Sequence, residues 1–131
     1  MTFVMDASIT AAWCFPDEDA SAATRAFDRI VDETAIVPAL WWFELRNVLL
    51  VGERRGRLNA RQIDGFLRLL RDLPIAIDRS PDEAAIFDLA RRHGLTFYDA
   101  AYLELARRGN ALATLDRALL KAAEAEHVPL T

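Results

Sequence analysis

The amino-acid sequence predicts an α/β sandwich built on a largely parallel sheet. Short apolar runs alternate with longer helical patterns along the chain, which is typical of strands joined by crossover helices. A length of 131 residues suits one domain, and 53% hydrophobic residues are enough for a substantial core. Because no linker, repeat or low-complexity tract interrupts the pattern, residues 1–131 are expected to form a single domain.

Four short apolar runs are the expected strands. Residues 2–5 form an uninterrupted run of the kind found in strands covered on both faces. The other expected strands are residues 35–37, 75–77 and 110–114. Residues 128–130 are a candidate for a final edge strand, where Pro129 is tolerated.

The segments between these runs carry helical patterns. We expect helices over residues 8–15, 17–33, 39–55, 59–73, 80–94, 98–108 and 116–126. Asn59 and Gln62 resemble a capping box. Ser80 is the expected cap of its helix, with Pro81 at the first helical position and Glu83 at the third.

The helix expected over residues 39–55 is apolar on nearly every face, so we predict that it is deeply embedded and can also reach a partner chain. Glu44 lies within it, and a buried carboxylate must be paired or protonated. No basic residue lies three or four positions before or after Glu44. A metal ion or a distant arginine is therefore the expected source of compensating charge.

Three further acids have an individual structural explanation. Asp6 follows a strand and suits the turn into the next helix beside Ser8 as a cap. Asp99 follows Thr96 by three residues, as in a capping box, and Asp116 suits an N-cap.

Together with Glu44, these acids have a second explanation if they converge at one edge of the sheet. Two carboxylates about 4 Å apart repel by about 4 kcal/mol at an effective dielectric constant of about 20, so a cluster needs cations or bound protons. A site made of carboxylate oxygens selects Mg²⁺ or Mn²⁺. Such a site suits phosphodiester hydrolysis.

Charge and cysteine usage narrow the class of protein. The net charge of −4 does not by itself indicate a nucleic-acid partner, although some of the arginines are candidate phosphate contacts. The arginine pairs before Gly56, Gly94 and Gly109 suit helix C-termini. With one cysteine and no secretory leader, a reducing cytoplasm is expected.

Zinc and thiol chemistry are not expected. His93 and His127 are interpreted as surface residues that make no zinc-binding spacing with Cys14. Cys14 has an apolar sequence environment without a neighbouring histidine, so it is expected to be a small core residue.

Four segments resemble the acidic motifs of the PIN-domain nucleases, and in order and spacing the VapC-type toxins of type II toxin-antitoxin pairs. These segments are Phe-Val-Met-Asp-Ala-Ser at residues 3–8, Pro38 to Glu44 with Asn47 and Leu50 following, residues 94–103, and Ala-Thr-Leu-Asp at residues 113–116. The resemblance extends over nearly the whole chain.

The resemblance implies a PIN-like three-layer α/β/α sandwich and an endoribonuclease that depends on Mg²⁺ or Mn²⁺. It also implies a cytoplasmic homodimer that a cognate VapB-type antitoxin neutralises. Its metal-binding and catalytic residues would be Asp6, Glu44, Asp99 and Asp116. Some relatives carry a further acid after the fourth motif, which residues 117–120 lack, so the number of ions stays open.

The same resemblance suggests supporting roles. Ser8 and Thr114 match small hydroxyl positions that would hydrogen-bond a carboxylate or metal-bound water, although Ser8 is equally suited to be an N-cap. Asn47, one turn after Glu44, is a candidate support for it. Aromatic residues are enriched at interfaces, so the tryptophans at positions 13, 41 and 42 are candidates for an antitoxin groove, the dimer interface or the core.

Three other classes of protein are alternatives for this sequence. The chain could be a degenerate PIN-like protein or RNA-binding module that does not cleave. A receiver domain would need an acidic neighbour of Asp6 and a lysine after a late strand, whereas Lys121 falls in an expected helix. A haloacid-dehalogenase-like phosphatase would need an aspartate where Ser8 stands.

Overall fold

Four strands and seven helices alternate along the chain in a computed structural model that describes residues 1–15 and 21–131. The strands are β1 (Thr2–Met5), β2 (Thr34–Pro38), β3 (Ile75–Asp78) and β4 (Ala111–Ala113). The helices are α1 (Ala7–Ala12), α2 (Ser21–Arg29), α3 (Leu40–Arg54), α4 (Ala60–Arg71), α5 (Glu83–His93), α6 (Phe97–Arg107) and α7 (Arg117–Ala125).

The four strands form one parallel sheet in the order β3-β2-β1-β4. In the register, Phe3 of β1 pairs with Ala35 of β2 on one side and with Ala111 of β4 on the other. The side chains of Phe3, Val4 and Met5 are fully buried, as expected for a strand with covered faces. The prediction of a parallel sheet is confirmed.

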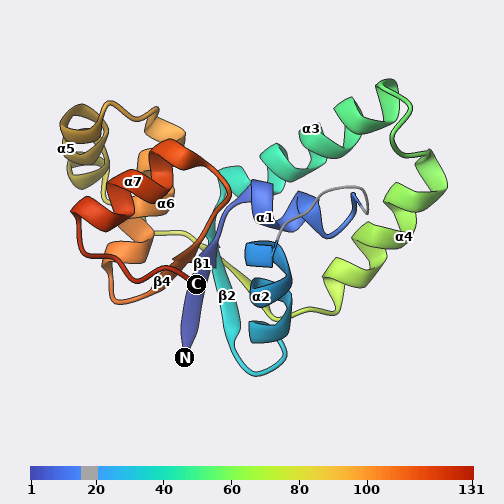
Figure 1. Ribbon diagram of the computed structural model, residues 1–131, viewed down its shortest axis with the longest axis horizontal. Helices are drawn as coiled ribbons and strands as arrows, with labels where there is room; N and C mark the ends of the chain where they lie inside the picture. Colours follow the sequence, from blue (N-terminus) through green and yellow to red (C-terminus); the bar gives the residue numbers. More distant parts are fainter. Residues whose placement is uncertain (16–20) are drawn as a thin grey trace.

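Helices cover both faces of this sheet. Figure 1 shows α5, α6 and α7 on one side of the strands and α1, α2 and α3 on the other. Helix α6 contacts β1, β2 and β4, while α1 packs on α2 and α3. The fold is therefore a three-layer α/β/α sandwich, as the resemblance implied. No helix in the described part of the chain is long and apolar enough to cross a membrane.

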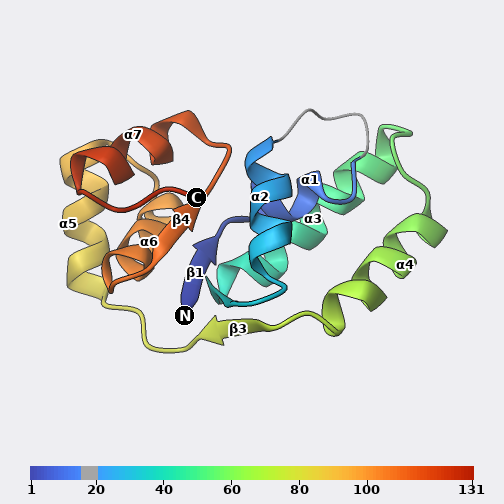
Figure 2. The same cartoon turned by 60° about the horizontal axis from the view of Figure 1, so that its bottom comes forward.

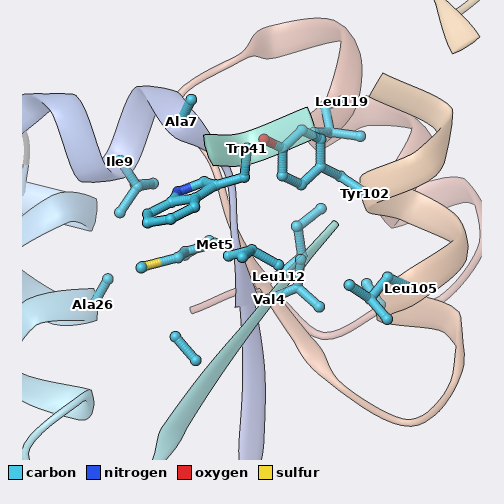
Figure 3. Close-up of a cluster of buried hydrophobic side chains, with 14 of the residues drawn as sticks. Val4, Met5, Ala7, Ile9, Ala26, Trp41, Tyr102, Leu105, Leu112 and Leu119 are labelled. Atoms are coloured by element: carbon cyan, nitrogen blue, oxygen red, sulfur yellow. The ribbon is translucent and has the colours of Figure 1, made fainter. Parts of the chain in front are cut away.

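The core joins the two helical layers through β1. Figure 3 shows the rings of Trp41 from α3 and Tyr102 from α6 in one cluster with Val4 and Met5 of the sheet. The Trp41 indole N–H donates to the buried Thr10 hydroxyl at 3.0 Å, which satisfies its polar atom. Burial of each large apolar side chain contributes about 1.5–3 kcal/mol, so this cluster fixes α3 and α6 relative to the sheet.

Helix α3 is not embedded on all sides, which corrects the sequence prediction. Its inward stripe consists of Trp41, Leu45, Leu49 and Gly52, and at Gly52 a Cβ atom would lie 2.7 Å from the Phe15 ring. Its outward apolar residues are exposed: Trp42, Phe43, Val48 and Leu50. The helix packs against the body along one stripe only, so apolar residues on its other faces remain in contact with solvent.

The start of α5 differs from the prediction. The N-cap is Asp82, not Ser80, and its side chain accepts a hydrogen bond from the Ala85 N–H at 3.1 Å. The Asp82 N–H donates to Glu104 of α6 at 2.8 Å, and Arg108 donates to the Ser80 carbonyl. These contacts from α6 hold residues 80–82 outside the helix, so Pro81 precedes the cap.

Other boundaries also differ at the ends of elements. Helix α2 ends at Arg29 rather than at residue 33, and the expected start of that helix at residue 17 lies outside the described residues. Residues 128–130 contribute a single bridge, between Leu112 and Leu130, instead of a strand. The capping box of Asn59 and Gln62 is confirmed. Gly56, Gly94 and Gly109 have positive φ angles, which suits the ends of helices.

Candidate active site

The four acids of the motifs lie at helix starts beyond the carboxyl edge of the parallel sheet. Asp6 directly follows β1, Glu44 lies in α3 after β2, and Asp116 opens α7 after β4. Asp99 lies in the first turn of α6. The negative charges of Asp6, Asp99 and Asp116 raise the pKa values of neighbouring acids. Asp99 raises the pKa values of Asp6 and Glu44, Asp6 raises that of Glu44, and Asp116 raises that of Asp99.

Asp6 is the most enclosed of the four acids, with 6% of its surface exposed. One carboxylate oxygen accepts hydrogen bonds from the Ser8 hydroxyl at 2.6 Å and from the Ile9 N–H at 3.1 Å. The other accepts a short hydrogen bond from the Thr114 hydroxyl. Asp6 is thus the N-cap of α1, and Ser8 is not.

Burial raises the pKa of Asp6, because a buried carboxylate loses its hydration. The hydrogen bonds from Ser8, Thr114 and Ile9 oppose this effect, and the charge of Asp99 adds to it. The site therefore holds Asp6 in one orientation while making its negative charge unfavourable without a cation.

Ser8 and Thr114 also connect two motifs that lie far apart in sequence. The Ser8 hydroxyl accepts from the Leu115 N–H at 3.1 Å, and the Thr114 hydroxyl accepts from the Asp116 N–H at 3.0 Å. Both hydroxyls thus receive a backbone donor after β4 while donating to Asp6. They fix the segment that carries Asp116 against the start of α1.

Glu44 has an uncharged hydrogen-bond partner, and no distant arginine pairs with it in the described part of the chain. The Tyr102 hydroxyl of α6 donates to its Oε1 atom at 2.6 Å. Burial raises the pKa of Glu44, the Tyr102 hydrogen bond lowers it, and the charges of Asp6 and Asp99 raise it further. Glu44 is only partly buried, because its helix packs along the adjacent stripe.

Asp99 and Asp116 have contacts within their own helices. The Asp99 N–H donates to the Thr96 hydroxyl, the cap of α6, at 3.1 Å. Asp116 caps α7 by accepting from the Leu119 N–H at 2.9 Å. Burial and the charge of Asp116 raise the pKa of Asp99, while Thr96 lowers it.

The chemistry of this donor set fits a divalent cation. In the described part of the chain, no ion pair joins any of the four carboxylates to a basic side chain. The pKa values of Asp6, Glu44 and Asp99 are raised, so these groups favour a proton or a cation. Among these same residues, no group of three or more acidic, histidine or cysteine side chains is arranged to hold a metal ion in this structure.

The remaining polar candidates lie apart from these contacts. Asn47 is exposed and lines a small hollow along α3. His93 corrects the prediction of a surface histidine, because it is largely enclosed and its Nε2 atom lies 2.6 Å from Glu126. Burial raises the pKa of Cys14, which disfavours a reactive thiolate, in agreement with its predicted packing role.

The three tryptophans have different positions. Trp41 belongs to the core, and Trp42 is 43% exposed on α3. Trp13 lines an apolar groove of about 760 Å³ between α1, α2 and α4, which includes Phe27, Phe66 and Leu70.

Sequence reasoning missed Tyr102. It lies three residues after Asp99 on α6, so the two side chains share a helix face. A tyrosine at this spacing beside an acidic motif was the signal that could have identified it. Burial and Glu44 raise the pKa of Tyr102, so its hydroxyl remains a donor.

Comparisons with known proteins agree with this fold. The family model of the PIN domain matches residues 3–125. Ribonuclease VapC3 of Pyrobaculum aerophilum is 35% identical over 123 residues, which cover 91% of this chain and 92% of that protein.

Two crystal structures share the fold. PAE2754 from Pyrobaculum aerophilum has a TM-score of 0.68 at 24% identity, over 93% of this chain and 84% of that one. FitAcB from Neisseria gonorrhoeae has a TM-score of 0.65 at 17% identity, over 99% of this chain and 96% of that one. By its family match and its curated relative, the chain belongs to the PIN domain family.

Proposed function

We propose that this protein is a metal-dependent endoribonuclease and acts in the cytoplasm as the toxin of a toxin-antitoxin pair. The observation that carries the proposal is the set of acids at one sheet edge whose charges disfavour one another and lack basic partners among the described residues. The relative named Ribonuclease VapC3 supports RNA as the substrate class.

Asp6, Glu44, Asp99 and Asp116 are the residues that would hold Mg²⁺ or Mn²⁺. When bound, such an ion supplies positive charge to a phosphodiester and favours its hydrolysis. The chain's own contribution is orientation. Ser8 and Thr114 hold the carboxylate of Asp6.

On the other side of the site, Tyr102 holds Glu44 by its hydroxyl. Asp99 and Asp116 are less enclosed than Asp6, which leaves them accessible to a substrate. Asn47 lies one turn after Glu44 and is the proposed polar contact at the edge of the site.

The direct test is RNA cleavage by the purified protein. Parent protein should cut RNA with Mg²⁺ or Mn²⁺ and stop when EDTA is added, and its products should carry 5′-phosphate ends. Products with 2′,3′-cyclic phosphate ends would indicate attack by the RNA 2′-hydroxyl instead. Metal-independent cleavage, or RNA binding without cleavage, would contradict the proposal and favour a degenerate RNA-binding module.

The proposed partner is a VapB-type antitoxin, supported by the name of the VapC3 relative. The apolar groove between α1, α2 and α4 offers exposed surface for an apolar partner segment, with Trp13 and Phe27 on one side and Phe66 on the other. The neighbouring reading frame should encode a protein that blocks cleavage when co-purified. If that protein binds equally well to a Phe27→Asp variant, the groove is not its binding site.

The proposed oligomer is a homodimer. Exposed apolar side chains on α3, including Phe43 and Leu50, offer surface for a second copy. Sedimentation of the purified chain should give the mass of two copies, and Phe43→Asp should shift it towards one. A monomeric parent protein would contradict the dimer.

A further inference from the structure

Positive charge is concentrated in one part of this acidic protein. We define the α3–α4 arm as residues 40–71, which comprise α3, the connecting turn and α4. This arm holds seven arginines against three acids, out of 16 basic and 20 acidic residues in the whole chain. Figures 1 and 2 both show the arm extending away from the sheet. The arm is therefore a basic projection from an acidic body.

The arginines of the arm differ from several elsewhere in their contacts. Arg29, Arg92 and Arg108 each form ion pairs with acids close to them. Six arginines of the arm form no ion pair with any described acid. They are Arg46, Arg54, Arg55, Arg61, Arg68 and Arg71. Five of these six are exposed, and Arg46 is partly enclosed. Their charge is available to a ligand.

One of these cations packs on an aromatic ring of the arm. The guanidinium of Arg46 lies 3.8 Å from the centre of the Trp42 ring and donates a hydrogen bond to the Trp42 carbonyl at 3.0 Å. These contacts orient the guanidinium without neutralising its charge.

The arm is continuous with the candidate active site. Glu44 lies in α3, and Arg55 follows eleven residues later at the C-terminal end of this helix. This spacing places them on nearly the same helix face, about 16 Å apart along the helix axis. Between them lies a hollow of about 180 Å³ lined by Asn47, Val48 and Arg55. A chain-like ligand can follow this face from the acids to the basic end of the arm.

An exposed aromatic ring accompanies the positive charge. Trp42, two residues before Glu44, is 43% exposed, and the Arg46 guanidinium lies over its ring. Exposed rings beside arginines are typical of surfaces that stack bases and contact the backbone of a single strand. An acidic peptide would use the arginines without needing the rings.

From these observations we infer that the α3–α4 arm binds single-stranded RNA on one side of the cut bond, through contacts between its arginines and backbone phosphates. The inference rests on the proposed ribonuclease function. Such contacts carry no base information, so they contribute affinity rather than sequence preference.

The test compares pairs of substitutions that change the net charge equally. The arm pairs are Arg54→Gln with Arg55→Gln, and Arg68→Gln with Arg71→Gln. The control pair is Arg25→Gln with Arg79→Gln, which are exposed arginines outside the arm. Binding of a fluorescently labelled single-stranded RNA is measured by anisotropy in EDTA over a series of salt concentrations.

Each arm pair should weaken binding, whereas the control pair should bind like the parent protein. Each lost phosphate contact should reduce the slope of log affinity against log salt by about 0.7. When the salt concentration is lowered from 1 M to 0.1 M, the variant's affinity should therefore increase about fivefold less for each lost contact. Equal losses in the arm and control pairs, or parent-like binding by both arm pairs, would overturn the inference. Polyglutamate serves as the probe for an acidic peptide partner in the same assay. Arm pairs that lose polyglutamate binding but keep RNA binding would also overturn the inference.

Cleavage with Mn²⁺ separates this inference from the proposed function. If the parent protein cuts RNA and the arm pairs cut it with unchanged KM, the inference fails and the proposed function stands. A rise in KM at nearly constant kcat supports the inference. If the parent protein neither binds nor cuts any RNA, both fail.

Discussion

The candidate site consists of two pairs of acids that are held in different ways. Asp6 and Glu44, which we call the long-range pair, receive hydroxyl groups from distant segments: Thr114 lies 108 residues after Asp6, and Tyr102 lies 58 residues after Glu44. Asp99 and Asp116, the local pair, make their hydrogen bonds within the first turns of α6 and α7. In the described part of the chain, only the carboxylates of the long-range pair accept hydrogen bonds from distant segments.

This difference suggests a division of roles. The long-range pair is fixed in place by side chains from several elements, so it can provide a rigid half of the site. In the described part of the chain, the Asp116 carboxylate accepts a hydrogen bond only from its own helix, and Asp116 is exposed. We therefore expect adjustment to a cation and substrate to occur mainly at Asp99 and Asp116.

The largest effect should come from the local pair. Asp99→Asn should reduce the rate of RNA cleavage by more than about 100-fold, because even residues that only support a metal ligand typically contribute about 10- to 100-fold. Its fold should be retained, because the cap of α6 is the Thr96 hydroxyl and not the Asp99 carboxylate. Cleavage at the parent rate by a pure, folded variant would remove Asp99 from the site.

The long-range pair is tested next by removing one hydroxyl. Tyr102→Phe takes away the donor to Glu44, so Mn²⁺ binding should weaken by about 10- to 100-fold, as for other groups that orient a metal ligand. Isothermal titration calorimetry measures this affinity directly. Tyr98→Phe is the matched control, because Tyr98 is exposed. Equal affinities in the two variants would mean that Tyr102 does not orient Glu44 for a metal.

Stability should separate the two pairs as well. Thr114→Val leaves an Asp6 oxygen and the Asp116 N–H without their partner, which should cost about 1–3 kcal/mol of unfolding free energy. Thr96→Val removes one helix cap and should cost about 1 kcal/mol. Urea denaturation of both variants gives the comparison. A larger loss for Thr96→Val would reverse the assignment of which pair depends on long-range contacts.

The same division explains what the sequence could predict. Local contacts follow from short spacing, so Asp116 as a cap and the box of Asn59 and Gln62 were predicted correctly. The cap of α5 was predicted at Ser80 instead of Asp82, because Glu104 binds the Asp82 N–H from another helix. Short-range patterns do not contain that interaction.

Long-range contacts account for the other errors. The motifs predicted that four acids matter, but the tyrosine that holds Glu44 becomes apparent only when α3 and α6 are packed on the same sheet. The apolar composition of α3 predicted full burial. The tertiary fold, however, decides which faces of a helix are covered by other elements, and only one stripe of α3 is covered. Phe43 is exposed for that reason.

The smallest expected effect is the pH dependence of stability. Burial raises the pKa values of Asp6, Glu44 and Asp99 above their ordinary values of 3.8 and 4.5, so their ionised forms destabilise the fold at neutral pH. This cost is full above the raised pKa values and is relieved as the pH falls through them. Without metal, the Tm should therefore rise slightly as the pH falls from 7 towards these raised pKa values.

Asp6→Asn provides the check on this pH effect. Asparagine keeps the cap of α1 and removes one repelling charge, so the Tm in EDTA at pH 7 should rise and its change with pH should shrink. The lowered pKa values of Glu33 and Glu126 act in the opposite direction, but their contribution is lost only as the pH falls below about 4.5. A variant with the same pH dependence as the parent protein would contradict the role of Asp6.

The most direct test of the four-acid site is the change in Tm when Mn²⁺ is added to the parent protein and to single variants at Asp6, Glu44, Asp99 and Asp116. An exposed acid on α7, changed by Glu124→Gln, serves as the control. A shared site predicts that Mn²⁺ raises the Tm of the parent protein and the control equally, and that each of the four variants loses most of this rise, because only the folded site binds the ion. A parent protein whose Tm does not respond to Mn²⁺, or four variants that respond as the control does, would contradict the account.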